Sequence, residues 1–224
     1  MKTRAFGLDF HTPDDLDPMD EITYRYGGRA QTLRYDVQRR DTVVEIGAFC
    51  GLHAMRLTQK VGPSGTVLAV EMIPEYAALC RLNSTWNHLD IAVGEYAVGD
   101  SNGISIAAID HHQRNSLPGG IVDQDGSRQR DMPVITKTLD ETLVPYLVVD
   151  LLTLQVNGTE VPLLRAATCW EKIRNLAIAT RYWHGSHQHQ WFKPFSCPPI
   201  IRLLQDQGYE VEEIDTWVYA WKRT

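Results

Sequence analysis

The sequence predicts a doubly wound α/β protein, with a mostly parallel sheet and helices on both faces. Strand-like and helix-like segments alternate along most of the chain, and repeated strand–helix units build a parallel sheet that is covered on both sides. The last residues, 209–224, have the pattern of two strands around Asp215. A terminal hairpin of this kind adds one antiparallel strand to the sheet.

Local signals assign each element in turn. Runs of apolar residues bounded by turn signals predict strands at residues 42–47, 65–71, 90–99, 104–109, 143–156 and 173–180. The expected helices span residues 52–62, 74–88, 157–172 and 199–208. Pro74 lies in the first turn of its helix, where a missing N–H costs least, and Gly62 and Gly208 end theirs.

Two segments depart from the alternation. Residues 17–40 are polar with apolar positions at helical spacing, so we expect residues 1–40 to form a helical lead-in. Residues 110–131 have few apolar side chains and are long for a loop, which indicates a mobile lid or a disordered insert. Because no linker or repeat divides the 224 residues, residues 1–224 are expected to form a single domain.

The composition limits the classes of partner. With 43% hydrophobic and 22% charged residues, the chain resembles an ordinary soluble globular protein. The net charge is −6 and acids are mixed with bases, so a nucleic acid is not an expected partner. No apolar run is long enough to span a membrane, so no membrane partner is expected either. The sequence leaves the oligomeric state open.

The cysteines and the amino terminus bear on location. The four cysteines are widely spaced and form no C-x-x-C pair, so we expect reduced thiols and neither disulfides nor a zinc site. The first residues lack the apolar core of a signal peptide. Together these features predict a cytoplasmic protein.

The stretch "TVVEIGAFCGLHAMRL" at residues 42–57 is the strongest functional signal. A buried strand runs into Gly47 and Gly51 and then into a helix, and glycines allow a ligand to approach the backbone closely. The helix start also presents unpaired N–H groups. Glu71 ends the second strand, where a carboxylate can accept hydrogen bonds from both hydroxyls of a ribose. The combination predicts a site for a nucleoside-containing ligand.

The spacing favours S-adenosylmethionine over a dinucleotide. The dinucleotide fingerprint G-x-G-x-x-G has three glycines, whereas this turn is E-x-G-x-x-x-G with two. Glu45 is a poor neighbour for a pyrophosphate and a suitable one for an ammonium or sulfonium group. S-adenosyl-L-methionine is therefore the expected cofactor.

Residues 40–178 resemble the class I S-adenosylmethionine-dependent methyltransferases, and specifically the FkbM family. The resemblance rests on the segment "DTVVEIGAFCGLHAMRLTQKVGPSGTVLAVE" and on "ITKTLDETL", which is similar to the family's threonine–leucine–aspartate segment. It implies a Rossmann-like sheet of seven strands with an antiparallel terminal strand, and methyl transfer that is usually to an oxygen.

The resemblance also implies a set of cofactor contacts. Glu45, Gly47 and Gly51 would line the methionine part, and Glu71 would hold the ribose. The remaining expected cofactor residues, flanking the turn, the ribose or the adenine, are Ala48, Phe49, Met72, Glu95, Tyr96 and Ala97.

This chain departs from the family where a substrate would bind. Thr153, Gln155 and Asn157 stand where the family has lysine, aspartate and glutamate, while Gly158 and Glu160 persist. After the fifth strand the family often has a glutamate, and this chain has Thr180 instead. Either the substrate differs from that of the family, or the catalytic step is weakened or lost.

The candidate catalytic residues are His184, Asn157 and Gln155. A base is needed if the acceptor is a hydroxyl, and His184 is the histidine of "HGSHQH" nearest the fifth strand. Histidines in a polar loop are more often solvated than catalytic, and without an acid in the run no metal site is expected. Asn157 could orient an acceptor or cap the following helix. His53 could touch the ligand or lie on the helix surface.

The sequence therefore predicts a metal-independent methyltransferase that acts on an oxygen of a small-molecule or sugar-like acceptor. One alternative is a protein of the same fold that binds the cofactor with little or no activity. A nicotinamide-dependent oxidoreductase and a metal hydrolase built on the histidine loop are further alternatives.

Overall fold

The computed structural model describes residues 2–13, 32–109, 117–118, 130–180, 197–214 and 217–222. The described strands are β1 (Lys2–Ala5), β2 (Leu8–His11), β3 (Thr42–Ile46), β4 (Thr66–Val70), β5 (Ala92–Gly94), β6 (Ala97–Gly99), β7 (Gly103–Ile109), β8 (Arg130–Thr138), β9 (Val149–Leu154), β10 (Ile173–Ala179), β11 (Tyr209–Ile214) and β12 (Trp217–Lys222). The described helices are α2 (Leu52–Val61), α3 (Pro74–Trp86), α5 (Leu139–Leu143), α6 (Glu160–Ala166) and α7 (Cys197–Asp206), with a 3₁₀ turn, η3 (Trp170–Lys172).

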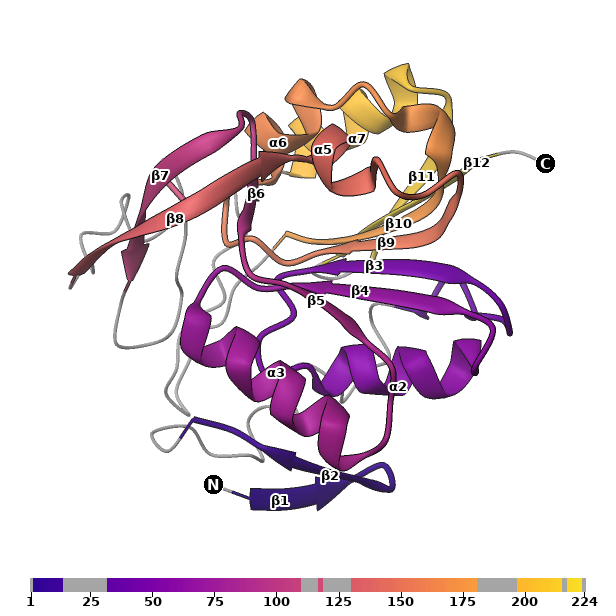
Figure 1. Cartoon of the computed structure of the whole chain (residues 1–224). Coiled ribbons are helices and arrows are strands. Elements are labelled where there is room, and N and C mark those ends of the chain that lie inside the picture. The colour runs from indigo at the N-terminus through magenta and orange to yellow at the C-terminus, as the bar shows by residue number, and fades with distance from the viewer. Residues whose placement is uncertain are drawn as a thin grey trace.

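The main sheet has seven strands in the order β11-β12-β10-β9-β3-β4-β5. β12 is antiparallel to both of its neighbours, and the other adjacent pairs are parallel. Helices α2 and α3 lie on one face and α5, α6 and α7 on the other (Figure 1). This arrangement confirms the predicted doubly wound, Rossmann-like fold with an antiparallel terminal strand.

The centre of the sheet is buried on both faces. All six residues of β9 are buried, as expected for a middle strand of a parallel sheet. Side chains of β3 alternate between two cores: Val44 and Ile46 pack with α5, α6 and α7, whereas Val43 packs with α2. The same alternation places Glu45 on the α2 face, at the carboxyl end of the strand.

A second sheet has the order β6-β8-β7 and extends beyond the end of the main sheet (Figure 1). Its inner face packs on the chain that follows β4, where Ala107 and Val134 contact the cluster around Ile73. Residues 132–142, for which the sequence predicts no element, form most of β8 and α5. Of the predicted insert 110–131, residues 117–118 and 130–131 are described and the rest lies outside the described residues.

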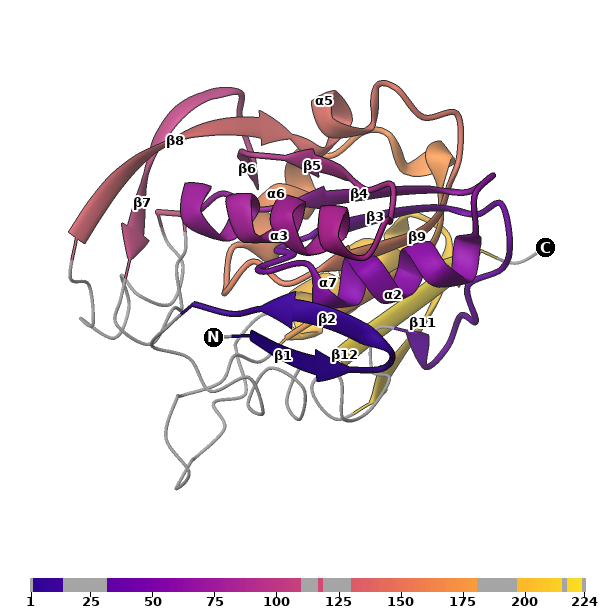
Figure 2. The same ribbon diagram turned by 60° about the horizontal axis from the view of Figure 1, so that its bottom comes forward.

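The amino-terminal prediction requires a correction. Residues 2–11 form an antiparallel hairpin and not a helix, because Phe6 and Gly7 turn the chain with positive φ angles and Leu8 and Phe10 alternate inward. Residues 32–40 contain no α-helix, and residues 14–31 lie outside the described part of the chain. The hairpin packs beneath α2 and α3 (Figure 2).

Two further elements are shorter than predicted. The strand expected at 143–156 begins only at Val149, because Leu143 ends α5. The helix expected at 157–172 is split into α6 and η3, since the chain becomes extended at Ala167.

Candidate cofactor site

The turn between β3 and α2 is held against the neighbouring strands by backbone hydrogen bonds. The N–H groups of Gly47 and Ala48 both donate to the carbonyl of Val70, at 2.9 and 3.0 Å. The N–H of Gln155 donates to the carbonyl of Ile46 at 2.9 Å, which joins the ends of β3 and β9. The turn is therefore fixed at the carboxyl edge of the sheet, where ligands of such sheets bind.

The two glycines of the turn are required by the packing of the chain itself. Both have positive φ, 86° at Gly47 and 81° at Gly51. A Cβ at Gly47 would lie 2.1 Å from the carbonyl oxygen of Gln155, and a Cβ at Gly51 would lie 2.4 Å from Sγ of Cys80. The sequence motif predicts glycine here for approach to a ligand, and the structure adds a steric reason within the fold.

Glu71 ties the turn to the end of β4. Its Oε2 accepts the N–H of Phe49 and its Oε1 accepts the N–H of Ile73, both at 2.9 Å. Phe49 is a non-glycine residue with a φ of 53°, so the carboxylate holds a turn that the residue itself disfavours. A carboxylate has about four acceptor positions, so a carboxylate at this strand end can accept more than one hydrogen bond.

Glu45 and His53 form a buried pair across the turn. Nδ1 of His53 lies 2.9 Å from Oε1 of Glu45, and both side chains are nearly inaccessible. Oε2 of Glu45 is also buried and has no hydrogen-bond partner among the described residues. Because His53 is buried, the helix-surface alternative for this residue is wrong. A buried carboxylate oxygen without a donor is suited to receive one from a ligand.

The end of the sheet next to α2 and α3 carries a negative charge. Burial, together with the nearby charges of Glu45 and Glu71, raises the pKa of the Cys80 thiol to about 12. The thiol therefore stays neutral and does not offset the two carboxylates. A cationic ligand complements this arrangement.

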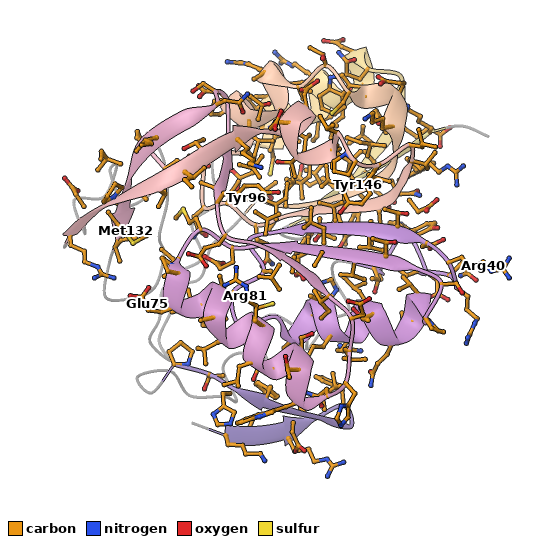
Figure 3. All side chains as sticks on the ribbon, viewed as in Figure 1. Arg40, Glu75, Arg81, Tyr96, Met132 and Tyr146 are labelled. Carbon is orange, nitrogen blue, oxygen red and sulfur yellow. The ribbon has the colours of Figure 1, made fainter. Side chains whose placement is uncertain are left out.

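The residues expected around the adenine separate into three environments. Ala97 lies in an apolar cluster with Ile73, against which Met72 also packs. Glu95 is exposed and forms an ion pair with Arg81 of α3 at 2.8 Å. Figure 3 shows Tyr96 on the opposite side of β5 from Arg81.

Tyr96 belongs to the core of the other face. It packs against the cluster of α5, α6 and α7, and the ammonium of Lys137 lies 4.7 Å from its ring. The structure therefore brings Met72 and Ala97 together but leaves the side chain of Tyr96 apart from them.

The carboxyl end of β9 presents uncharged side chains. Thr153 is buried and lies in register with Glu45, and Gln155 and Asn157 follow it, each partly exposed. Asn157 has a φ of 55°, a left-handed conformation that asparagine tolerates better than most residues. Thr180, at the end of the adjacent strand, is buried as well.

Glu160 supports the turn that contains Asn157. Its carboxylate accepts the N–H of Gly158 at 3.1 Å, and burial raises the pKa of this carboxyl. The N-cap position of α6 is Thr159 and not Asn157, and its side chain makes no capping hydrogen bond. His184, the predicted base, lies outside the described residues, as do the other histidines of its loop.

The sequence model described as the Methyltransferase FkbM domain matches residues 45–211 of this chain. The chain belongs to the FkbM methyltransferase family. The match begins at Glu45 in the strand before the glycine turn and ends in β11, so it takes in all the parallel strands of the main sheet except the start of β3.

Curated relatives are also methyltransferases. The chain is 34% identical to the protein-L-isoaspartate O-methyltransferase of Methanothrix thermoacetophila over 119 residues, which cover 47% of this chain and 57% of that protein. It is 34% identical to protein-L-isoaspartate O-methyltransferase 1 of Archaeoglobus fulgidus over 67 residues, 29% of this chain and 31% of that protein. The chain thus spans from about a third to just over half of the length of these relatives.

Solved structures show the same fold at low identity. The precorrin-6y C5,15-methyltransferase of Geobacter metallireducens has a TM-score of 0.52 at 14% identity, with 96% of this chain and 94% of that chain covered. The fibrillarin of Aeropyrum pernix, which contains natively bound S-adenosyl-L-methionine, has a TM-score of 0.52 at 13% identity, with 97% and 84% covered.

This FkbM methyltransferase uses S-adenosylmethionine as its cofactor. The residues present fit that group, because a buried acceptor oxygen of Glu45 lacks a donor and the cofactor carries an ammonium group. The carboxylate of Glu71, at the end of the next strand, accepts the N–H groups of Phe49 and Ile73, and hydroxyl groups are donors of the kind that a carboxylate accepts.

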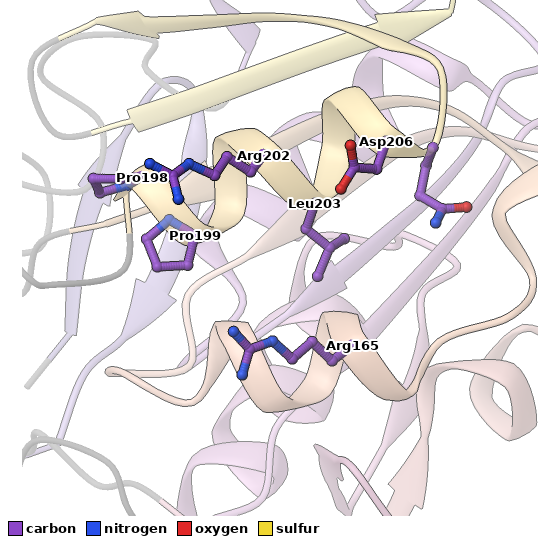
Figure 4. Close-up of a pocket in the computed structure, with 7 residues that line it drawn as sticks. Arg165, Pro198, Pro199, Arg202, Leu203 and Asp206 are labelled. Atoms are coloured by element: carbon purple, nitrogen blue, oxygen red, sulfur yellow. The ribbon is translucent and has the colours of Figure 1, made fainter.

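Other features of the molecule lie apart from this edge. A surface groove of about 460 Å³ runs between α6 and α7 on the opposite face of the sheet (Figure 4). It is lined by Arg165, Pro198, Pro199, Arg202, Leu203, Asp206 and Gln207. The described residues contain no group of three or more potential metal ligands. Among them, no helix is both long and apolar enough to cross a membrane.

Proposed function

We propose that this methyltransferase methylates an oxygen of a small-molecule, sugar-like acceptor by direct displacement without a metal. The observation that carries the proposal is the uncharged rim at the carboxyl ends of β9 and β10, next to Glu45 at the end of β3. A rim of threonine and amide side chains can bind hydroxyl groups through neutral hydrogen bonds.

In this proposal each end of the cofactor has a partner in the glycine-turn region. Oε2 of Glu45 accepts from the ammonium group, and the carboxylate of Glu71 accepts from the ribose hydroxyls. Met72 and Ala97 supply apolar contacts for the adenine. When bound, S-adenosylmethionine supplies a transferable methyl group on a positively charged sulfur.

The protein's main task is then to place the acceptor. Orienting two reactants can contribute about 7–11 kcal/mol in well-arranged systems, so positioning by itself supplies a large part of the rate. Asn157 is proposed to orient the acceptor, with Gln155 beside it on the same loop. His184 is proposed to take the proton from the acceptor hydroxyl.

The charge of the chain supports a small acceptor over a nucleic acid. The net charge is −6, and acidic and basic residues are mixed along the sequence, which does not favour a phosphate backbone. The curated relatives are named for action on a protein, so a peptide acceptor is the comparison that the test has to include.

The test is an acceptor screen with S-adenosylmethionine labelled in the transferred methyl. The panel contains monosaccharides, glycosides, phenols, carboxylic acids and an isoaspartyl peptide. Label transferred to a sugar-like hydroxyl supports the proposal, whereas transfer to the peptide or to a nitrogen atom contradicts it. No transfer to any acceptor, with cofactor binding intact, would favour a binding protein with little activity.

Variants of Asn157 locate the acceptor once one is found. Asn157→Gly removes the amide while keeping the positive φ, so kcat/KM is expected to fall about 10–100-fold with cofactor affinity unchanged. Asn157→Asp restores an acid of the kind common near this position in the family. A higher turnover from Asn157→Asp would show that the active site of this chain has lost a catalytic group.

A further inference from the structure

We infer that His53 is a positioning residue for the amino group of the cofactor, acting through Glu45. It holds Oε1 of Glu45 and so directs Oε2 toward the ammonium group. This inference rests on the function proposed above, in which Glu45 receives that ammonium.

The contact is built by the path of the glycine turn. Glu45 lies next to the last residue of β3, and His53 is the second residue of α2. The left-handed conformations of Gly47 and Gly51 turn the chain back on itself. The side chain of His53, in the first turn of α2, therefore reaches Glu45 in β3. The resulting distance of 2.9 Å between Nδ1 and Oε1 is that of a good hydrogen bond.

Among the described groups around Glu45, His53 is the one that holds its carboxylate in place. From β4 the nearby charge is Glu71, whose oxygens already accept two backbone N–H groups. From α3 the neighbour is the neutral thiol of Cys80, and from β9 it is Thr153. Within the described part of the chain, the one hydrogen bond that the Glu45 side chain makes is the one to His53.

The two carboxylate oxygens of Glu45 therefore have different roles. A carboxylate that is free to rotate would present either oxygen, in several orientations, to a ligand. With Oε1 occupied, the carboxylate plane is set and Oε2 is left in a buried position without a donor. Preorganisation of this kind increases ligand affinity because less freedom is lost on binding.

The test compares two ligands that differ only in the amino group. S-adenosylhomocysteine carries it, and the analogue with hydrogen in place of the amino group does not. We expect calorimetric titration of the wild type to give about tenfold tighter binding of S-adenosylhomocysteine, the size of effect that one charge-assisted hydrogen bond produces. In His53→Leu this ratio should fall to about 1, while affinity for the deaminated analogue stays within about twofold.

A conservative variant and a control ligand distinguish a positioning role of His53 from a purely structural one. His53→Asn places an amide N–H near the position of Nδ1, so it should restore most of the ratio. Unfolding temperatures without ligand verify that each variant folds. If His53→Leu does not fold, His53→Met provides the same test. Affinity for the deaminated analogue serves as the internal control, since a general distortion of the site would weaken both ligands equally.

The outcomes distinguish this inference from the function on which it rests. A wild type that binds neither ligand would defeat the proposed cofactor contacts. A wild type with the tenfold ratio, together with His53→Leu and His53→Met that keep it, would overturn the role of His53 alone. Equal weakening of both ligands by the variants would likewise overturn it in favour of a purely structural role.

Discussion

At the scale of single residues, the glycine turn shows how sequence signals and their physical causes can differ. The sequence identifies Gly47 correctly as a residue that must be glycine, but it cannot show what would collide with a side chain. The colliding group is the carbonyl oxygen of Gln155, more than a hundred residues away in the sequence. Such a contact follows from the pairing of β3 with β9 and not from the local motif.

This contact predicts a large difference between two glycines with similar backbone angles. Gly47 and Gly208 have φ angles of 86° and 82°, but a Cβ at Gly208 would have no atom within 4 Å. We expect Gly208→Ala to cost about 1 kcal/mol of unfolding free energy from backbone strain alone. Gly47→Ala should cost about 3 kcal/mol or more, because overpacking adds to that strain. Urea denaturation measures both, and equal costs would contradict the steric explanation.

Glu160 predicts a dependence of stability on pH. Burial raises the pKa of this carboxyl in the folded protein above its value in the unfolded chain, so the folded state binds its proton more tightly. The favourable contribution is therefore complete at acidic pH, below the unfolded pKa, and is lost as the pH rises through the folded pKa.

Glu160→Gln removes the titration while its Oε1 can still accept from Gly158. The variant should have a higher free energy of unfolding than the wild type at pH 7, and the gain should shrink as the pH falls to about 4. Urea denaturation across this pH range measures the difference. A variant that is less stable than the wild type at pH 7 would show that the ionised carboxylate is favourable in the fold.

Some residues at this edge of the sheet can be located from local sequence signals, whereas the position of others depends on the path of the chain. Glu71 is recognisable because it ends a strand about 20 residues after the turn. His53 is not, because whether a residue in the first turn of α2 faces Glu45 or solvent depends on the angle at which the helix leaves the turn. The close approach of Cys80 to Gly51, which a Cβ would obstruct, is a contact between segments about 30 residues apart that the local motif does not reveal.

At the scale of elements, the hairpin of β1 and β2 packs against the glycine turn and supports it. Leu8 and Phe10 of β2 pack in one cluster with Phe49 and Cys50 of the turn. Asn83 of α3 joins the two: its amide accepts the N–H and donates to the carbonyl of His11, at 2.7 and 2.9 Å, and it also donates to the carbonyl of Cys50 at 2.8 Å. The hairpin therefore extends the support of the cofactor site beyond the matched family domain.

Two asparagines on α3 test this support. Asn83→Ala should lower the free energy of unfolding by about 2–4 kcal/mol and weaken binding of S-adenosylhomocysteine, because it leaves buried backbone groups of the turn and hairpin unpaired. Asn87→Ala is the control, since Asn87 binds the backbone of Asp9 at 2.6 and 3.0 Å but has no contact with Cys50 among its hydrogen bonds.

We expect Asn87→Ala to destabilise the protein with little effect on cofactor affinity. Chemical denaturation and calorimetric titration give the two quantities for each variant. If both variants weaken the cofactor in proportion to their loss of stability, the hairpin acts on the whole domain and not on the turn.

The hairpin was missed because its signal in the sequence is short. Two strands of four residues are marginal by themselves, and their alternation is hard to separate from helical spacing. The helices α2, α3 and α7 were predicted well, since Gly62, Pro74 and Gly208 mark helix ends directly. β8 and α5 were not predicted, because this part of the sequence combines a partly exposed strand with a helix of only five residues.

At the scale of the whole molecule, cofactor binding should stabilise the fold as a unit. The proposed contacts involve the turn after β3, the end of β4 and the chain near β6, which come from three separate segments of the sequence. A ligand that binds the folded state alone at 100 times its Kd adds about 2.7 kcal/mol to the free energy of unfolding. For a domain of this size, that corresponds to a rise of about 5–10 °C in Tm.

Differential scanning calorimetry with saturating ligand therefore tests the site through the stability of the entire protein. S-adenosylmethionine and S-adenosylhomocysteine should each raise Tm by this amount, whereas NAD should leave it unchanged because the turn lacks the third glycine of a dinucleotide site. Glu71→Gln should abolish the rise relative to its own unliganded Tm, since the variant loses the charge that holds both Phe49 and Ile73. Glu75→Gln, at an exposed position in the first turn of α3, should keep it. A rise with NAD, or a full rise in Glu71→Gln, would mean that the ligand is recognised by residues other than those at the carboxyl edge of β3 and β4.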